Sequence, residues 1–581
     1  MHTKYLRHTH THTHTYTTRK NKMANEAAPM SMPDKGVGAV GNQMADEDKA
    51  KDFTYDALKN YYVNDGPKAF WMAIYGLANA GFFAWGFYQF ATDEFEEVRD
   101  ALGWGLPTAK ACAMCIKFNT ALLLFTVLRN FLSALRTTML SKIIPFDKNI
   151  QFHKGIAWVI LFFALAHTVA HYCNYFYIAT NENPREELKF LIDANDPEAV
   201  APTTRELAYL TVPGATGHIL LLVMCFMYSS AIVSIRRPYF EAFWYTHHLF
   251  ILFYFLICIH GLPGSITPPN AFFWLVGPML FYALERGLRI CRGNQDTVLL
   301  AAVQHPSNVL ELRMKKTEFK YQPGMYLFLN CPFVSSQEWH PFTITSAPEQ
   351  DFVSVHVRIV GDWTGAVRDL LNPSMGMGVV AEDIATAADG SPILRIDGPF
   401  GTASEEVFNY KTVVLVGGGI GVTPFASILK SIRYRYERQQ ATGLKQLSIT
   451  KVYFFWIARD KSAFEWFGEL LAIVEEALPD GIIDINIFLT AKMNAKAVDE
   501  LMRQDQFAER DVITGLKSKT QYGRPNWDKI FDQLCVDHAG QEIGVFFCGP
   551  VPISKKLYQT SRRCTMDTSH ATKIKFNKEN F

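Results

Sequence analysis

Two apolar stretches that carry several histidines each, residues 152–181 and 241–262, constrain the fold of this chain more than any other feature. The first has no charged residue from 155 to 181, which is long enough to cross a bilayer, since a helix needs roughly 20 apolar residues to do so. Ionisable side chains are costly inside a membrane, so we interpret these histidines as functional. They are His153, His167 and His171 on the first stretch, and His247, His248 and His260 on the second.

The spacing of the histidines suggests paired ligands. His153 and His167 are fourteen residues apart, which places them within ~40° of one helix face and ~21 Å apart along its axis. His247 and His260 are thirteen apart, about 140° out of phase on an ideal helix, so this helix must bend or His248 must take part. Neutral imidazole is a good axial ligand for haem iron, so the two helices predict two bis-histidine haems, one above the other. Histidines bonded within a helical core are the alternative.

Charge is unevenly distributed along the 581 residues, although the net charge is only +1. Residues 1–66 are polar and include the tract HTHTHTHTYTT, so we expect a disordered cytoplasmic tail, with Met23 as an alternative to Met1 as the start. Residues 67–292 are dominated by long uncharged runs, and the remainder has an ordinary soluble composition. The balanced charge gives no reason to expect a nucleic-acid partner.

The apolar runs predict six membrane-spanning helices, at residues 69–91, 111–132, 155–180, 211–235, 242–262 and 268–285. Basic residues cluster after the second, fourth and sixth runs, and acidic residues fill the first and third loops. The excess of Lys and Arg marks cytoplasmic loops, so both termini face the cytoplasm. His153 and His247 then lie near the inner surface, and His167 and His260 lie toward the outer one.

Two soluble domains follow the membrane region. Residues 293–405 contain short β-rich segments between Pro and Gly turns, which predicts a small antiparallel β-barrel. Residues 406–581 alternate strands and helices, which predicts a doubly wound α/β sheet with its ligand at the carboxyl ends of the strands. The turn GGGIGVTP follows a β-branched strand, and its glycines let backbone amides approach a phosphate at the start of the next helix.

Several long motifs resemble one family. FHKGIAWVILFFALAHTVAH and RRPYFEAFWYTHHLFILFYFLICIHG are similar to the third and fifth membrane helices of NADPH oxidase catalytic subunits of the phagocyte type, within the ferric reductase superfamily. HPFTITSAP resembles the flavin motif of ferredoxin-NADP reductases. The resemblance, from about Ala69 to Phe581, implies an inner haem b between His153 and His247 and an outer haem b between His167 and His260. It also implies FAD, NADPH, O2 as the acceptor and superoxide as the product.

The resemblance also assigns individual residues. Those implied to bind FAD are His340, Pro341, Phe342, Thr343, Ile344, Thr345, Ser346, His356 and Arg358. Those implied to bind NADPH are Gly417, Gly419, Ile420, Gly421, Thr423, Pro424, Arg459, Thr490, Arg524, Cys548, Gly549 and Pro550. Arg129 and His171 are implied to lie near the outer haem and to favour a developing anion, and Phe581 to stack on the flavin. Arg129 has two alternative roles, as a partner of a haem propionate or as an arginine that reaches the membrane surface.

Other interpretations remain open at this point. A plasma-membrane ferric or cupric reductase uses the same scaffold, and an ion channel with vestigial redox domains is a more distant alternative. By analogy we expect cytosolic activators, including a Rho-type GTPase, together with a small membrane subunit. The segment from Lys492 to Lys519 is a candidate control element. The host is the plasma membrane or an internal membrane, with the NADPH side in the cytosol, and the short outer loop at 263–270 favours release of free superoxide over peroxide.

Overall fold

The structure is a computed structural model, and it describes residues 55–180, 203–262, 264, 266–371, 379–380, 392–459, 461–490, 503–567 and 569–579. Three expectations lie outside these residues: the disordered tail up to residue 54, the first part of the candidate control element and the terminal Phe581.

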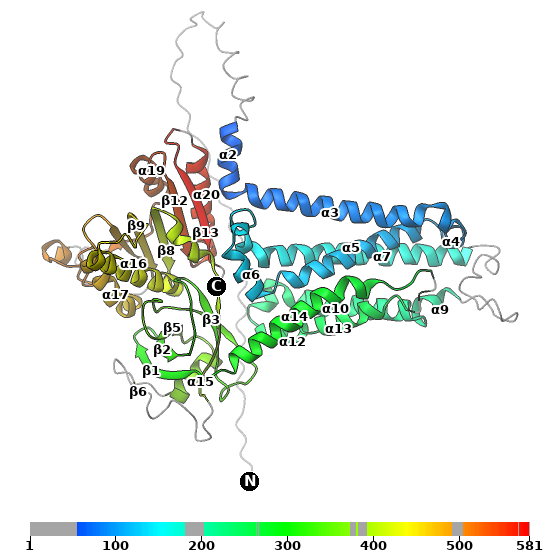
Figure 1. Cartoon of the computed structure of the whole chain (residues 1–581), viewed down its shortest axis with the longest axis horizontal. Coiled ribbons are helices and arrows are strands. Elements are labelled where there is room, and N and C mark those ends of the chain that lie inside the picture. Colours follow the sequence, from blue (N-terminus) through cyan, green and yellow to red (C-terminus); the bar gives the residue numbers. More distant parts are fainter. Residues whose placement is uncertain are drawn as a thin grey trace, which may run out of the picture. The chain divides into compact units, whose positions relative to one another are not determined.

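The N-terminal half of the described chain is helical (Figure 1). The long helices are α3 (Gly66–Ala91), α5 (Gly105–Phe125), α7 (Asn149–Thr180), α10 (Val212–Ala231), the pair α12 (Phe240–His247) and α13 (Phe250–Ile259), and α14 (Ala271–Gly293). Shorter helices are α2 (Tyr55–Asn64), α4 (Glu96–Leu102), α6 (Arg129–Arg136), α9 (Thr204–Tyr209) and α11 (Val233–Arg236), with 3₁₀ turns at Asp93–Phe95, Met139–Lys142 and Phe146–Lys148.

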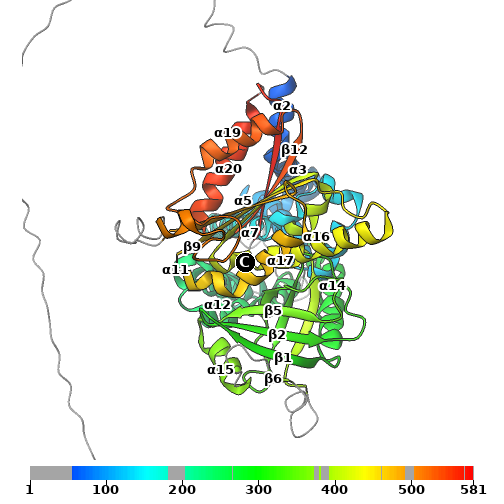
Figure 2. The same ribbon diagram turned by 90° about the vertical axis from the view of Figure 1, so that its left-hand side faces the viewer.

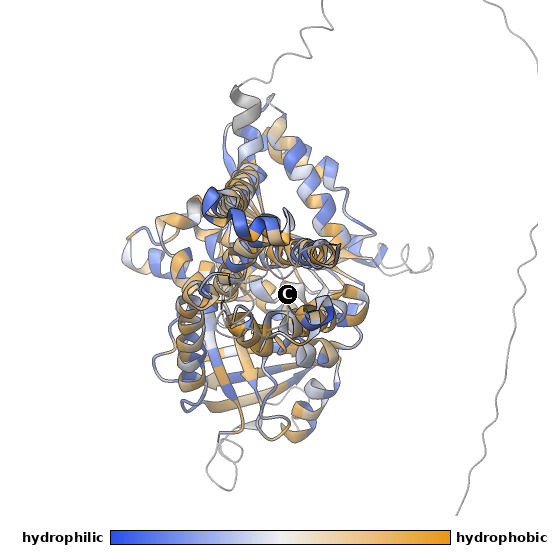
Figure 3. Cartoon of the chain, turned by 90° about the vertical axis from the view of Figure 1, so that its right-hand side faces the viewer, coloured by the Kyte–Doolittle hydropathy of each residue, from blue (hydrophilic) through white to orange (hydrophobic). Residues whose placement is uncertain are grey.

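Four helical segments in the described residues are long and apolar enough to cross a membrane: Gly105–Phe125, Phe146–Thr180, Val212–Ala231 and Phe240–Ile259. They overlap the second to fifth predicted spans, so the prediction of six is confirmed for four. The last predicted span differs because α14 carries four charged residues in its second half. Figure 3 colours the ribbon by hydropathy. Large apolar side chains of α7, such as Trp158, Phe162 and Phe176, are exposed on the helix surface.

Two helix boundaries differ from, or sharpen, the sequence prediction. The second predicted span, 111–132, is not one helix: α5 ends at Phe125, and α6 begins separately at Arg129. The fifth is interrupted between His247 and Phe250, so of the two explanations for the angular mismatch of its histidines, a bend and a role for His248, the structure shows the bend. This interruption lets both ends of the segment present a histidine toward α7.

The predicted barrel consists of two antiparallel sheets. Figure 2 shows the strands of the sheet β5-β2-β1-β6 side by side, and the second sheet has the order β4-β3-β7. The strands are β1 (Val298–His305), β2 (Val309–Lys315), β3 (Tyr326–Asn330), β4 (His340–Thr343), β5 (Val353–Arg358), β6 (Val379–Val380) and β7 (Arg395–Phe400), with helix α15 (Asp362–Leu371) after β5 and a 3₁₀ segment (Ala403–Asn409) after β7. Their inward residues form one apolar core that includes Leu312, Leu327 and Val355.

The last part is a parallel sheet of order β11-β10-β9-β8-β12-β13 with helices on both faces. Its strands are β8 (Thr412–Gly418), β9 (Lys451–Ala458), β10 (Ile483–Leu489), β11 (Gln521–Tyr522), β12 (Glu542–Cys548) and β13 (Lys573–Lys578). Its helices are α16 (Thr423–Thr442), α17 (Glu465–Ala477), α19 (Trp527–Asp537) and α20 (Val551–Met566), with 3₁₀ turns at Gly419–Val422 and Lys461–Phe464.

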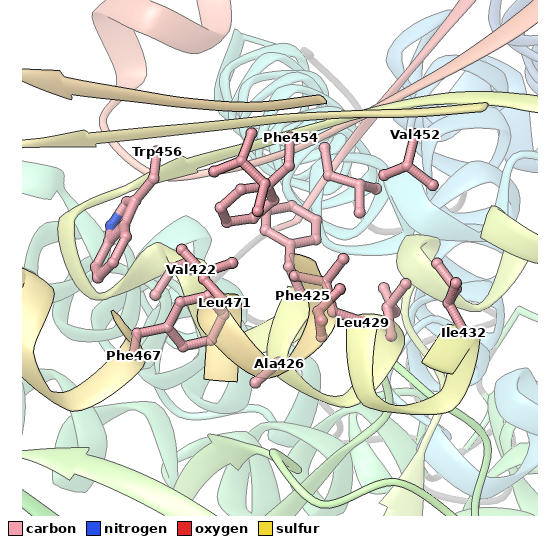
Figure 4. Close-up of a cluster of buried hydrophobic side chains, with 14 of the residues drawn as sticks. Val422, Phe425, Ala426, Leu429, Ile432, Val452, Phe454, Trp456, Phe467 and Leu471 are labelled. Atoms are coloured by element: carbon pink, nitrogen blue, oxygen red, sulfur yellow. The ribbon is translucent and has the colours of Figure 1, made fainter. Parts of the chain in front are cut away.

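The alternating direction of the side chains along each strand explains why helices pack on both faces of the sheet. In β9, Phe454 and Trp456 pack with α16 and α17, as Figure 4 shows for Phe425, Leu429 and Phe467. Phe455, which lies between them in β9, points to the opposite face and packs with the helices α19 and α20. Successive side chains of a strand point to opposite faces, so a nearly continuous apolar strand is buried on both sides. The doubly wound prediction is confirmed.

Candidate functional site

Two pairs of histidine rings face each other between α7 and the broken helix α12–α13. The ring centres of His153 and His247 are 6.4 Å apart, and those of His167 and His260 are 6.1 Å apart. A metal–imidazole bond is about 2 Å long, so a metal ion between two rings would set their centres about 6 Å apart. Both pairs therefore fit a metal held by two axial histidines, and the structure brings all four predicted ligands together as expected.

Hydrogen bonds decide which ring nitrogen is available in three of these histidines. Nδ1 of His167 lies 2.8 Å from the carbonyl oxygen of Ala109, which can only accept, so Nδ1 donates. The hydroxyl of Thr126 donates to the carbonyl oxygen of Leu123, so it accepts from Nδ1 of His153 at 2.8 Å. Each ring then carries its lone pair on Nε2, the arrangement that outer partners impose on metal-ligating histidines.

His260 has the same arrangement. The hydroxyl of Thr216 donates to the carbonyl oxygen of Val212 at 2.5 Å and accepts from Nδ1 of His260 at 2.9 Å. Nδ1 of His247 is buried and has no hydrogen-bond partner among the described residues. No hydrogen bond among the described residues therefore fixes which ring nitrogen of His247 is available, and its assignment rests on the ring facing His153.

Two further histidines lie beside these pairs without being part of them. The ring of His248 packs against Trp244 at 4.6 Å, and its Nδ1 lies 2.7 Å from the carbonyl oxygen of the same residue. The break after α12 thus turns His247, not His248, toward His153. His171, one turn beyond His167 on α7, meets that ring edge-on at 4.5 Å, which places it at the outer pair as the sequence predicted.

The predicted flavin motif forms β4 and the turn after it. In the antiparallel pairing with β3, Pro341 lies opposite Phe328 and Thr343 lies opposite Tyr326. His340 stacks close to Trp363, with ring centres 4.2 Å apart. His340, Pro341 and Phe342 are partly or fully exposed, so they are accessible to a planar ligand.

The side chains in the second half of this motif, Ile344 to Ser346, have a structural role. Ile344, Thr345 and Ser346 are completely buried within the barrel, so their side chains offer no surface to a flavin. The hydroxyl of Thr345 pairs with His356, and Ser346 accepts a hydrogen bond from the amide of Ser354. The side chains of these three residues thus join β4 to β5, and their backbone groups are the part that would meet a flavin.

The two predicted residues on β5 have different surroundings. His356 lies in a cluster with His305 and Glu311, and burial lowers the pKa of His356 to about 3, so it is neutral at physiological pH. Glu311 also accepts two hydrogen bonds from the guanidinium of Arg313. Arg358 ends the strand and is exposed, as a residue that meets an anionic ligand must be.

The residues predicted for NADPH gather at the carboxyl edge of the parallel sheet. Arg459 follows β9, Thr490 follows β10 and Arg524 comes two residues after β11, and these three strands are neighbours. The hydroxyl and amide of Thr490 both donate to the carbonyl oxygen of Ala458, which holds the two strand ends together. Both arginines are exposed, so their guanidinium groups are accessible to a phosphate.

The glycine-rich turn lies between the ends of β8 and β12. Ile420 and Gly421 belong to the turn, and α16 begins with Thr423 and Pro424 in its first turn. Gly419 has a φ of +58°, and a Cβ on Gly421 would lie 2.4 Å from the carbonyl oxygen of Cys548, so no side chain fits there. The glycines thus bring the turn against the segment Cys548, Gly549 and Pro550.

Cys548 ends β12 beside Gly417, at the point where the strand order changes direction. The residue is 6% exposed, and burial raises the pKa of its thiol to about 12, so it is a neutral, compact side chain at physiological pH. Such a residue can border a nicotinamide ring without reacting with it.

Three family models match consecutive parts of the chain: "Ferric reductase like transmembrane component" over residues 117–258, "FAD-binding domain" over 295–404 and "Ferric reductase NAD binding domain" over 410–562. A superoxide-generating NADPH oxidase heavy chain of Dictyostelium discoideum is 47% identical over 528 residues, 91% of this chain and 99% of that protein. "NADPH oxidase 3" of Homo sapiens is 37% identical over 552 residues, 85% of this chain and 95% of that protein.

The chain belongs to the NADPH oxidase family. It is an integral membrane oxidoreductase of the ferric reductase superfamily, with FAD, NADPH and haem as cofactors and O2 as the electron acceptor.

Arg129 of the oxidase does not lie at the outer histidine pair. It begins α6, and its guanidinium lies over the ring of Phe328 in β3, 4.3 Å from the ring centre. Thr126, three residues earlier, bonds to His153, so Arg129 is on the side of the inner pair. Its expected place near the outer haem is corrected: the continuous apolar pattern concealed the end of α5, which separates Arg129 from the membrane helix.

Lys110 is a residue of the outer end that sequence reasoning missed. It follows Ala109, whose carbonyl oxygen binds His167, and it interacts electrostatically with both His167 and His171. Its ammonium donates to the hydroxyl of Thr267 at 3.0 Å and lies over the ring of Phe90. The sequence signal for it is a lysine directly before the apolar run that begins at residue 111.

Proposed function

We propose that the oxidase moves electrons from cytosolic NADPH through FAD and two b-type haems to O2 on the opposite side of the membrane. The observation that supports this most directly is the pair of facing histidine sets, three members of which have Nε2 available for a metal. When bound, NADPH supplies a hydride, FAD passes its electrons on singly, and the haems carry single electrons.

The nucleotide edge of the parallel sheet would select NADPH. Arg459 and Arg524 would hold the 2′-phosphate with planar, charge-assisted hydrogen bonds, which favours NADPH over NADH. The glycine turn would receive the pyrophosphate at the start of α16, where backbone amides point outward. Cys548 would border the nicotinamide, and the terminal Phe581 would stack on the flavin until NADPH displaces it.

We propose that the domain boundaries lie at residues 66, 292 and 405. They separate the N-terminal tail, the transmembrane domain, the FAD-binding domain and the NADPH-binding domain.

The outer end of the bundle would form the O2 site. His167 and His260 would together hold the outer haem, so the groups that meet O2 would be protein side chains beside this pair. We assign His171 and Lys110 to this role, with Lys110 in the place expected for Arg129. A cation close to the reacting oxygen stabilises the negative charge that develops during one-electron reduction.

Orientation follows from the charges of the loops. The basic residues around α6 and at the end of α14 favour a cytoplasmic position, so the nucleotide-binding domains lie in the cytosol. We keep the proposal of six crossings, with α3 and α14 as the first and last, in the plasma membrane or an internal membrane. A short outer loop at 263–270 offers little to retain the product, so we expect free superoxide.

Protein activators are a further part of the proposal. By analogy with the phagocyte-type oxidases, we propose cytosolic activators that include a Rho-type GTPase, together with a small membrane subunit. The segment 492–519 lies between the Thr490 strand end and Arg524, so a partner that binds there would reach the NADPH edge. Its described part is held by Asp511, which accepts hydrogen bonds from Thr514 and Thr520.

The decisive experiment is cytochrome c reduction by the purified protein loaded with FAD and haem. The oxidase predicts NADPH-dependent reduction that superoxide dismutase abolishes. Reduction of ferric or cupric chelates that dismutase does not affect, without O2 consumption, would instead identify a metal reductase. A protein that binds no haem and consumes no NADPH would contradict both functions.

A further inference from the structure

A buried carboxylate joins the FAD barrel to the last long helix of the membrane domain. Asp397 in β7 is 2% exposed, and its two oxygens accept hydrogen bonds from Nε of Arg289 at 2.7 Å and Nε of Arg292 at 2.8 Å. Nη2 of Arg292 lies 2.6 Å from the same oxygen. Both arginines belong to the last turns of α14, so one side chain of the barrel binds two of the helix.

Lys316 strengthens the same junction. Its ammonium donates to the carbonyl oxygen of Arg292 at 2.5 Å and to that of Ile396 at 2.7 Å, so it bridges α14 and β7 directly. Burial lowers the pKa of Lys316 to about 8. The junction is therefore fixed by backbone and side-chain contacts on both sides of Asp397.

Asp397 lies in one row with the flavin motif. In the sheet β4-β3-β7, Phe328 of β3 pairs with Asp397 on one side and with Pro341 on the other. Neighbouring strands are about 4.8 Å apart, so the carboxylate and the motif are two strand spacings from each other. The three strands are hydrogen-bonded neighbours, so β7 is connected to β4 through Phe328 of β3.

The arginines on the other side of the junction are linked to the inner histidine pair. Arg292 also donates to Oδ1 of Asn130 at 3.0 Å, and Glu285 accepts from the amides of Asn130 and Phe131 at the start of α6. Thr126, which bonds to His153, lies three residues before α6. A continuous set of contacts thus connects the flavin motif to the inner pair.

Buried charges such as those of Asp397, Arg289 and Arg292 are not the simplest way to stabilise a junction between two domains. Removing ions from water is expensive, and apolar residues of similar volume often hold an interface as well. A charged junction differs from an apolar one in its directionality: each oxygen of Asp397 has a fixed partner, so β7 has one position and one angle on α14.

We propose that Asp397, with Arg289 and Arg292, is a positioning residue that sets the distance and orientation between the flavin site and the inner histidine pair. It thereby controls electron transfer between them without contacting either reacting group. This inference rests on the proposed electron path, and it adds a residue outside the histidines and the flavin motif.

The test compares Asp397→Asn with wild type and with Asp484→Asn, which removes a surface carboxylate paired with Lys451 at 2.7 Å. Three quantities are measured on the full chain loaded with FAD and haem: NADPH-driven reduction of ferricyanide, which takes electrons from the flavin; NADPH-driven haem reduction without O2; and hydrogen–deuterium exchange of β7 and β3. FAD and haem contents are measured in parallel.

We expect Asp397→Asn to keep both cofactors and the ferricyanide rate, to slow haem reduction about tenfold or more, and to increase exchange in β7. Asp484→Asn should match wild type in all three. The inference is overturned if haem reduction and exchange remain unchanged, or if the ferricyanide rate and FAD content fall together with haem reduction, which is the result of a purely structural role. If wild type itself fails to reduce its haem with NADPH, the proposed function is overturned, and the exchange data still show whether Asp397 holds β7.

Discussion

Asn64, the last residue of α2, completes the outer edge of the parallel sheet at Phe576. Its side-chain oxygen accepts from the amide of Phe576 at 2.9 Å, and its side-chain amide donates to the carbonyl oxygen of Ile574 at 2.8 Å. An edge strand exposes such backbone groups, and proteins cover them to avoid unwanted pairing. The side chain at the end of α2 thus covers two backbone groups on the edge of the nucleotide-binding sheet, and Asp65 adds a salt bridge to Arg562 at 3.1 Å.

Replacement of Asn64 by Ala should destabilise the nucleotide-binding part. Two hydrogen bonds to β13 are lost, at a cost of about 1–3 kcal/mol, which lowers the unfolding temperature of a domain of this size by about 2–4 °C for each kcal/mol. Differential scanning fluorimetry of the detergent-solubilised protein measures this shift. Asn60→Ala, one turn earlier on α2, is the control. Equal unfolding temperatures for the two variants would show that the edge contact contributes nothing.

Alanine replacements of the four facing histidines should each remove haem. His153→Ala and His247→Ala should lower the haem content by about half and leave the outer site, because each iron loses one of its two ligands. His167→Ala and His260→Ala should do the same at the outer site. The dithionite-reduced absorbance spectrum measures the content. His248→Ala, which changes a histidine bonded to Trp244, serves as the control, and loss of haem in that variant would contradict the assignment of His247.

Some parts of this structure could be predicted from the sequence and others could not. Membrane helices and the doubly wound sheet follow from apolar runs and alternation, and the interruption after His247 is one of the two explanations for the angular mismatch with His260. The end of α5 could not be predicted, because the residues around Thr126 are as apolar as those in the helix. Tertiary contacts decide it: Thr126 bonds to His153, and Glu285 of α14 holds the first amides of α6.

The sequence also identified the flavin motif without showing which of its side chains point outward. Thr345 and Ser346 have hydroxyl groups that suit a ligand as well as they suit a neighbouring strand. Their partners, Ser354 and His356, come from β5, so only the three-dimensional pairing reveals that they face inward. Lys110 was missed for a related reason: a charged residue at the border of an apolar run looks like its end, whereas α5 extends to Gly105.

Glu405 should make the stability of the protein depend on pH. Burial raises the pKa of Glu405 to about 7, against partial compensation by Arg136, and the buried Glu579 lies nearby. Its folded pKa is above the unfolded value of 4.5, so the folded state holds a proton that the unfolded chain releases. The free energy of unfolding therefore decreases as pH rises from about 4.5 to 7, by on the order of 1–3 kcal/mol.

The measurement is the unfolding temperature between pH 5 and 8. Glu405→Gln keeps an acceptor for the amide of Thr402, which Glu405 binds at 2.5 Å, and it removes the titration. We expect the variant to lose much of the dependence on pH and to be more stable than wild type above pH 7. Parallel curves for the two proteins would show that Glu405 does not titrate in this range.

Lys110 provides a test of the outer end of the electron path. Lys110→Met removes the cation that interacts with His167 and His171 and keeps an unbranched apolar chain, so the haem content should be unchanged. Without that charge the developing anion is less stabilised, and loss of one such electrostatic contact lowers the rate by about tenfold to a thousandfold. Dismutase-sensitive cytochrome c reduction by NADPH measures the rate.

Lys117→Met is the matched control for this experiment. Lys117 lies two turns further along α5 and also binds the segment before α14, through Oδ1 of Asn270 at 2.7 Å. If both lysines serve only to attach α5 to that segment, the two variants will lose the same fraction of activity. If Lys110 acts on the reaction, Lys110→Met will lose far more, and its anaerobic haem reduction by NADPH will remain normal because the defect lies after the outer haem. Slow haem reduction in Lys110→Met would place the defect earlier and contradict the assignment.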